Sequence, residues 1–306
     1  MRVAGDRCGG FDLGIRLGRE GDVGWVICFS IMAIAGTVGV VANVNRLRFE
    51  RRVGRERGTL LAVPPSPLPQ PPALGLPAPV ERYRALAVGD RAPVRTMRLT
   101  HGGTFRLKAN AAPLAIRGAQ LFTADPPGFL WTGRIRMAPG VWVDARDMAV
   151  AGAGSMRVLL ESTVQLADAS GPELDQGSAL RLLAELVWLP TALFDARYVT
   201  WAPVDADHAR ATLRLGKVEV SALFEFGADG LPTGVTAHRF MDKGGLKPWG
   251  GLYRDWRTVS GLRVPFEADV DWRLPTGTFT YAHWLLDALD YDGAEDTACA
   301  PARTTL

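Results

Sequence analysis

Hydrophobic and polar residues alternate with a period of two along most of the chain after residue 90. In the segment 263–273 the odd positions are mainly charged and the even positions are apolar, and the segment 217–226 repeats the pattern. Successive side chains of a β-strand point to opposite faces, so this pattern is typical of an antiparallel sheet with one solvated face. We expect about ten strands between residues 94 and 289.

Short turn sequences separate several of these segments, at 101–103, 228–230 and 275–277. Each contains glycine beside a polar residue or proline, which is typical of β-hairpins. On this interpretation His101 lies in a hairpin turn.

One segment departs from the alternation. Between Leu174 and Val187 the leucines recur at helical spacing, and Pro190 ends the run. Ser170, followed three residues later by Glu173, has the spacing of a capping box. The sequence therefore predicts one central helix of roughly 18 residues, a length set by the leucine spacing.

A single helix is too small to cover the apolar face of a flat sheet of about ten strands. The sheet must curl to bury that face. We therefore expect a mainly β domain, a curved antiparallel half-barrel wrapped around one central helix, with room for a pocket as well as a core.

The N-terminal region contains no charged residue from Val23 to Val44. About 20 apolar residues cross the hydrocarbon core of a bilayer, so this run predicts a transmembrane helix before the β domain. A cleaved signal peptide and a buried helix are the alternatives, and no A-x-A cleavage site follows the run. Four arginines precede the run and six follow it closely, which favours a cytoplasmic β domain.

A basic flank and a proline-rich stretch follow this run. Eight prolines lie between residues 64 and 79, and they predict an extended spacer. The predicted organisation is an N-terminal tail (1–22), a transmembrane helix (23–44), the basic flank and linker (45–79), the β domain (80–291) and a disordered tail (292–306).

Composition narrows the range of partners. The net charge is +3, from 35 basic and 32 acidic residues, which argues against nucleic acid as a partner. The four histidines and three cysteines show no metal-ligand spacing, and no nucleophile elbow, phosphate loop or dinucleotide fingerprint is present. The sequence predicts no metal, no cofactor and no catalytic residue, and leaves enzymatic activity open.

Several phrases resemble those of an uncharacterised bacterial family, a domain of unknown function that follows an N-terminal membrane segment. They are Phe122–Phe129 (FTADPPGF), Arg136–Gly140 (RMAPG), Asp168–Gly177 (DASGPELDQG), Ala184–Pro190 (AELVWLP) and Gly261–Pro265 (GLRVP). The fold is similar to the half-barrels of lipoprotein carriers of the LolA and LolB type, which enclose an acyl-chain cavity. Those carriers work outside the cytoplasm, so the resemblance and the arginine count leave the side of the membrane open.

Two sets of residues are candidates for a site. Aromatic side chains of the expected apolar face could line a hydrophobic cavity, although a plain core is the alternative: Phe129, Trp131, Trp188, Phe224, Phe226, Phe266 and Trp272. The polar set is Asp168, Glu173, Asp175 and His238, which could act as acid and base or, for the carboxylates, simply stabilise the helix N-terminus.

The sequence thus predicts a membrane-anchored protein that binds a lipid or another hydrophobic ligand. A membrane-associated hydrolase that uses the polar set is one alternative. A non-enzymatic structural or protein-interaction module is the other.

Overall fold

The computed structural model describes residues 19–71, 75–241 and 245–292. The chain divides into two compact units, Met1–Asn45 and Arg46–Leu306. Its helices are α1 (Arg19–Leu61), α2 (Ala78–Ala87), α3 (Pro172–Glu185), the short 3-10 turn η1 (Leu186–Trp188) and α4 (Pro190–Leu193). The expectations for residues 1–18 and 293–306 lie outside the described residues.

The first helix is longer than the sequence pattern indicated. It continues through the basic flank to Leu61, where the pairs Arg46–Glu50 and Arg52–Glu56 link successive turns. In the described residues, no helix is both long and apolar enough to cross a membrane. The transmembrane helix expected over 23–44 stays a prediction.

The second unit is built on one antiparallel sheet, which has thirteen strands in the described residues rather than about ten. In chain order they are β1 (Thr96–Phe105), β2 (Leu114–Ala124), β3 (Pro127–Ala138), β4 (Val141–Val150), β5 (Ala153–Leu160), β6 (Val164–Ser170), β7 (Val199–Pro203), β8 (His208–Leu215), β9 (Val218–Phe226), β10 (Pro232–Phe240), β11 (Leu246–Val259), β12 (Leu262–Leu274) and β13 (Gly277–Tyr291).

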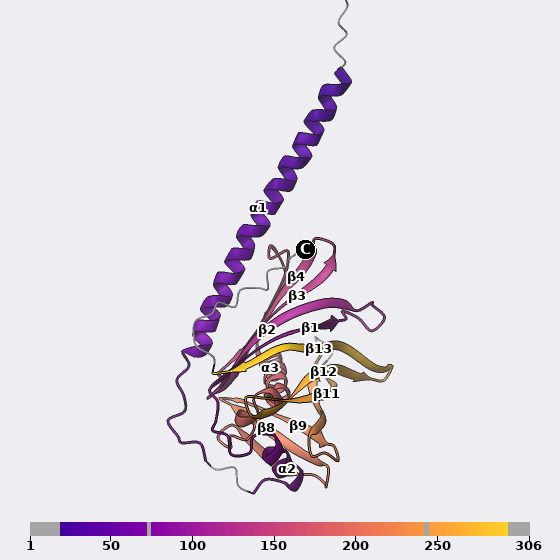
Figure 1. The fold of residues 1–306 in the computed structure, drawn as a ribbon. Helices are drawn as coiled ribbons and strands as arrows, with labels where there is room; N and C mark the ends of the chain where they lie inside the picture. Colours follow the sequence, from indigo (N-terminus) through magenta and orange to yellow (C-terminus); the bar gives the residue numbers. More distant parts are fainter. Residues whose placement is uncertain (1–18, 72–74, 242–244, 293–306) are drawn as a thin grey trace, which may run out of the picture. The chain divides into compact units, whose positions relative to one another are not determined.

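The strand order explains where the central helix lies. It runs β6-β5-β4-β3-β2-β1-β13-β12-β11-β10-β9-β8-β7, so β1 and β13 pair at the centre and two meanders extend outward (Figure 1). The chain leaves one edge at β6 and re-enters at the other edge, β7, through α3, η1 and α4. This connection spans the whole width of the sheet, so the helices cross its concave face.

The sheet curls until both halves reach the same helix. α3 contacts β4 and β5 of one half and β8, β9 and β10 of the other. The two halves also meet directly, because the β4–β5 turn lies against the β8–β9 turn. A Cβ at Gly152 would lie 2.4 Å from the carbonyl oxygen of Leu215, so only glycine fits there. The expected curved half-barrel around a central helix is confirmed.

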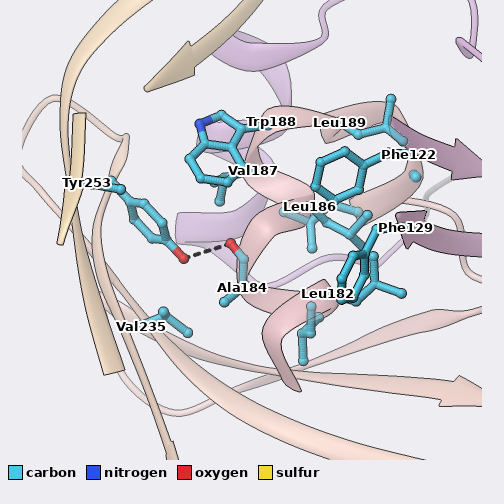
Figure 2. Packing of buried hydrophobic residues seen from close by; sticks show 14 of the residues in the cluster. Phe122, Phe129, Leu182, Ala184, Leu186, Val187, Trp188, Leu189, Val235 and Tyr253 are labelled. Atoms are coloured by element: carbon cyan, nitrogen blue, oxygen red, sulfur yellow. Dashed lines mark hydrogen bonds between the residues drawn. The ribbon is translucent and has the colours of Figure 1, made fainter. Parts of the chain in front are cut away.

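The concave face is filled by packed side chains. Phe122 and Phe129 of the sheet lie against Leu182 and Leu186 of the helical connection (Figure 2). Tyr253 also anchors α3 by donating a hydrogen bond from its hydroxyl to the Ala184 carbonyl at 2.8 Å. These contacts bury most of the apolar surface that the alternating pattern predicts.

The convex face is covered over β2 and β3 by the end of α1. Leu60 is buried there with Leu121 and Leu130. Beside it, Glu56 accepts a hydrogen bond from Arg146 at 3.0 Å. The last turns of α1 are thereby attached to the sheet within the second unit.

Two local expectations are wrong. α3 begins after Gly171, which has a φ of 116° and no side-chain cap, because Ser170 is still paired in β6. His101 lies inside β1 rather than in a turn. Gly103 is needed for close approach to β13, since a Cβ there would lie 1.9 Å from the His283 carbonyl oxygen.

Candidate functional site

A cluster of polar side chains is buried between α3 and the concave face. Arg181 of α3 forms ion pairs with Asp147 of β4 and with Glu185 one turn along the helix, each at 2.8 Å. Gln120 of β2 donates to Glu185 at 2.7 Å. The Arg181 guanidinium lies 5.0 Å from the centre of the Trp131 ring. Charge pairing and the aromatic face together compensate the cost of removing this guanidinium from water.

His101 borders this cluster and is neutral. Its Nε2 accepts a hydrogen bond from the indole N–H of Trp131 at 2.9 Å, and its Nδ1 lies 3.1 Å from the Gly102 carbonyl oxygen. An indole nitrogen only donates, so Nδ1 carries the proton. Burial, with a further contribution from the positive charge of Arg181, lowers the pKa of His101 to about 4.

The space around this cluster is small. The cavity between His101, Gln120, Trp131 and Glu185 has a volume of about 10 Å³. That volume is about the size of one water molecule and far below the roughly 300–1,000 Å³ of ligand pockets. The buried cluster therefore holds α3 in place and offers no room for an acyl chain.

A much larger space opens beside the first residues of β1, and we name it the Asp125 cleft. It has a volume of about 620 Å³ and lies between the end of α1, the linker, β1, the β2–β3 turn and α4. Its apolar lining includes Leu60, Leu61, Val63, Val94 and Ala192.

Asp125 is held by three polar partners at the edge of this cleft. Its Oδ1 accepts hydrogen bonds from the Tyr198 hydroxyl at 2.5 Å and from the Ser66 N–H at 3.0 Å. Arg197 pairs with its Oδ2 at 3.0 Å. Burial alone would raise the pKa of Asp125, but these partners outweigh it and hold that pKa below its usual value.

The same interactions bind the linker to the domain. Arg197 pairs with Asp195 at 2.6 Å and donates to the carbonyl of Leu68 at 2.7 Å. Ser66 and Leu68 both belong to the proline-rich stretch, so this segment is fixed along the cleft instead of acting only as a spacer. Burial and the hydrogen bond to Asp125 raise the pKa of Tyr198 to about 12, so it donates throughout the neutral range.

The cleft has unpaired positive charge available to a ligand. Asp125 and Asp195 are occupied by Arg197, and Asp292 accepts from the backbone N–H groups of residues 95 and 96 at 2.8 and 2.9 Å. In the described part of the chain, no ion pair joins the side chains of Arg95 and Arg98, which line the cleft, to a carboxylate.

The seven predicted aromatic residues belong to the core. Six are buried, Phe266 is half-buried, and all seven pack in one hydrophobic cluster. Trp131 and Trp188 border the cavity of about 10 Å³ described above. Ligand contact by this set stays a prediction.

The structure does not connect the four residues of the predicted polar set. Asp168 pairs with Arg157 on β5, Asp175 accepts from the Gly154 N–H at 2.7 Å, and Glu173 is exposed in the first turn of α3. In the described residues, no hydrogen bond or ion pair joins His238 to any of the three carboxylates. Nor does any group of three or more His, Cys, Asp or Glu there form a possible metal site.

Sequence reasoning missed the residues that matter most here. Arg181 lies between the leucines of α3, and a charged residue within a leucine-rich run was the available signal. Asp125 lies within the FTADPPGF phrase, but no sequence pattern places it beside Arg197. The hydrogen-bond partners of Asp125 are distant along the chain: Tyr198 is 73 residues away and Ser66 is 59 residues away. A local sequence pattern could not identify them.

The neutral state of His101 predicts a dependence of stability on pH. Its pKa in the folded chain is about 4, against about 6.5 for an unfolded chain, so the unfolded state binds the extra proton between these values. The contribution of the neutral His101 to the free energy of unfolding is fully present above pH 6.5, and it declines as the pH falls towards 4. Chemical unfolding across this range should show that decline, on the order of 3 kcal/mol, and His101→Gln should remove it. An unchanged decline in the variant would contradict the assignment.

Comparison with known proteins places the chain in a family. Among proteins with curated descriptions, none matches. A solved structure of a LolA superfamily protein from Nitrosomonas europaea is similar at 10% identity and a TM-score of 0.38, covering 71% of this chain and 93% of that one. A beta-barrel-like protein of the DUF1849 domain of unknown function from Brucella abortus is similar at 12% identity and a TM-score of 0.26. That match covers 66% of this chain and 99% of the other. At these TM-scores neither likeness supports an inference about function.

The family model gives the stronger result. It matches residues 69–284, which include most of the sheet and the helices that cross it. This confirms the resemblance carried by the FTADPPGF and DASGPELDQG phrases. The chain belongs to the family of unknown function DUF6544.

Proposed function

We propose that the chain binds an amphipathic ligand, with an apolar tail and an acidic head, in the Asp125 cleft. The observation that carries the proposal is an apolar wall beside two guanidinium groups, around a space of about 620 Å³. Among the described residues, neither guanidinium has an ion pair. That volume lies within the range of small-molecule sites, which are mostly apolar with a few placed polar groups.

The apolar part of the cleft suits a hydrocarbon tail. Leu61 is 40% exposed beside Val63 and Val94, so its side chain has apolar surface to cover. Covering such surface contributes about 25 cal/mol for each Å² removed from water. A tail along this wall gains affinity without any change in the packed interior of the half-barrel.

The charged part of the cleft suits an acidic head group. Arg95 is exposed just before β1. Arg98 is half-buried on the convex side of β1, and both line the cleft next to the apolar wall. A guanidinium donates up to two parallel hydrogen bonds to a carboxylate or a phosphate. Because the nearby carboxylates are already bonded, they compete little with the ligand for these arginines.

The hydrolase alternative has no comparable support. Asp168 and Asp175 are engaged by Arg157 and by the Gly154 backbone, and Glu173 is solvent-exposed at the start of α3. General acid–base catalysis requires the acting groups to lie within hydrogen-bonding reach of a common substrate. We therefore favour binding over hydrolysis.

Binding can be measured with a fluorescent fatty acid, dansylaminoundecanoic acid, titrated into the full chain. We expect Arg98→Glu to weaken its binding by roughly tenfold or more, because a charge-assisted hydrogen bond contributes about 1.5–3 kcal/mol. The uncharged amide of the same probe should bind wild type about as weakly as the acid binds the variant.

Arg117→Glu is the matched control. Arg117 is also on the convex side of the sheet, is 80% exposed, and does not line the cleft. Its substitution should leave the affinity within about twofold, well under the 1.4 kcal/mol of a tenfold change. Equal losses in both variants, or no binding of the acid by wild type, would refute the proposal.

Attachment to a membrane through residues 23–44 is a separate proposal, supported by their uncharged sequence. Cells that express the full chain should retain it in the membrane fraction after carbonate washing. The double substitution Ile31→Arg and Val40→Arg should release it, because each arginine costs roughly 2.5–3.5 kcal/mol in a bilayer. Leu246→Arg, at an exposed position on β11, is the control and should leave the chain in the membrane fraction. A soluble wild-type chain would contradict this proposal.

A further inference from the structure

Two neighbouring strands of the sheet pair over only part of their lengths and leave a gap between them. β9 and β10 are neighbours, but their register pairs them only as far as Thr236 opposite Leu223. Beyond that pair, β9 continues back to Val218 and β10 continues to Phe240 without pairing to each other. A cavity of about 530 Å³ lies here, lined by both strands and by Gln176 of α3. We name it the β9–β10 slot.

The slot exposes backbone groups on its β9 side. The N–H of Phe226 donates to Asp207, which precedes β8, so even-numbered residues of β9 direct their backbone groups towards β8. Backbone direction alternates along a strand, so Glu219 and Ser221 direct theirs into the slot. In the described residues, no hydrogen bond from β10 reaches either of them.

The β10 side of the slot already binds an amide. The Gln176 side chain donates from Nε2 to the His238 carbonyl at 2.8 Å and accepts at Oε1 from the Phe240 N–H at 3.4 Å. The backbone N–H and C=O of one residue in a neighbouring parallel strand would make the same two hydrogen bonds. The protein's own side chain thus replaces a missing strand at one position of this edge.

The charges around the slot are mainly positive. Arg210 of β8 is exposed and, in the described part of the chain, has no ion pair. Arg273 forms a long ion pair with Asp271, at 3.4 Å, and its side chain stays 45% exposed. Glu219 is neutralised by Arg214 at 2.7 Å. Beneath the slot, Arg239 stacks on the lining residue Trp249 at 5.3 Å, and its buried Nε has no partner.

We propose that the β9–β10 slot binds an extended, acidic peptide segment of a partner protein. Main-chain hydrogen bonds to Glu219 and Ser221 provide strand addition, and acidic side chains of the peptide meet Arg210 and Arg273 at its mouth. This site is independent of the Asp125 cleft, because the two have no lining residue in common. It also gives His238, which lines the slot, a place in recognition rather than in catalysis.

Fluorescence anisotropy of the full chain tests the proposal with a labelled, end-capped octapeptide of alternating glutamate and valine. Two further peptides replace glutamate by lysine or carry N-methyl groups on alternate backbone nitrogens. We expect the acidic peptide to bind and each of the other two to bind at least tenfold more weakly. Equal binding of the lysine peptide would overturn the charge argument, and equal binding of the N-methylated peptide would overturn strand addition.

Substitutions locate the site. Ser221→Pro removes one N–H that points into the slot and no backbone hydrogen bond to β8, so affinity should fall at least tenfold. Ser221→Ala loses the same side-chain hydrogen bond to Thr212 of β8, at 2.8 Å, but keeps the N–H, so it should keep the affinity within about twofold. Arg210→Glu, on an exposed side chain, should weaken the acidic peptide at least tenfold, with Arg117→Glu as control. If thermal unfolding shows that Ser221→Pro does not fold, Arg210→Glu decides alone. Unchanged binding in Arg210→Glu would place the peptide at another edge of the sheet and refute the proposal.

Discussion

The ion pairs of Arg181 with Asp147 and Glu185 fix the element on which the fold depends. The connection from β6 to β7 must cross the entire concave face, and α3 is the part of it that contacts both halves of the sheet. A charged group that is buried without partners is costly, so positions of α3 that separate Arg181 from Asp147 are disfavoured. The apolar residues around it supply most of the favourable free energy, while this pairing selects one register for the helix.

A filled interior has a direct consequence for function. The apolar face that suggested a ligand cavity is occupied by α3, η1 and α4, and the polar cluster beside them leaves room for about one water molecule. Two larger spaces lie at places where elements meet imperfectly: the linker against the β2–β3 turn, and β9 against β10. The proposed binding at such places leaves the folded core unchanged, so the proposal assigns ligand recognition and stability to different residues.

The general architecture could be predicted from sequence because it follows from local patterns. Alternation in segments such as 263–273 defined strands, and the leucine spacing after Leu174 defined the central helix. The width of the apolar face then required a curled sheet. The strand count was low because short strands such as β7 do not alternate clearly.

The candidate site could not be predicted in the same way. The Asp125 cleft is assembled from the linker, β1, the β2–β3 turn and α4, and the slot depends on where β9 and β10 stop pairing. Neither property has a local sequence signal. The acidic residues near α3 attracted attention because they are close in sequence, but Asp168 and Asp175 bond to different neighbours on β5.

The central claim is that this half-barrel binds amphipathic ligands outside its packed interior. The most direct measurement is photolabelling of the full chain with a diazirine fatty acid, followed by peptide mapping of the labelled sites. The account predicts label on the walls of the Asp125 cleft, within 60–70, 93–98 and 191–197, and its loss on competition with unlabelled fatty acid. Label concentrated on interior residues such as Trp131 or Trp272 would show that the half-barrel opens to take ligand inside, and would contradict it.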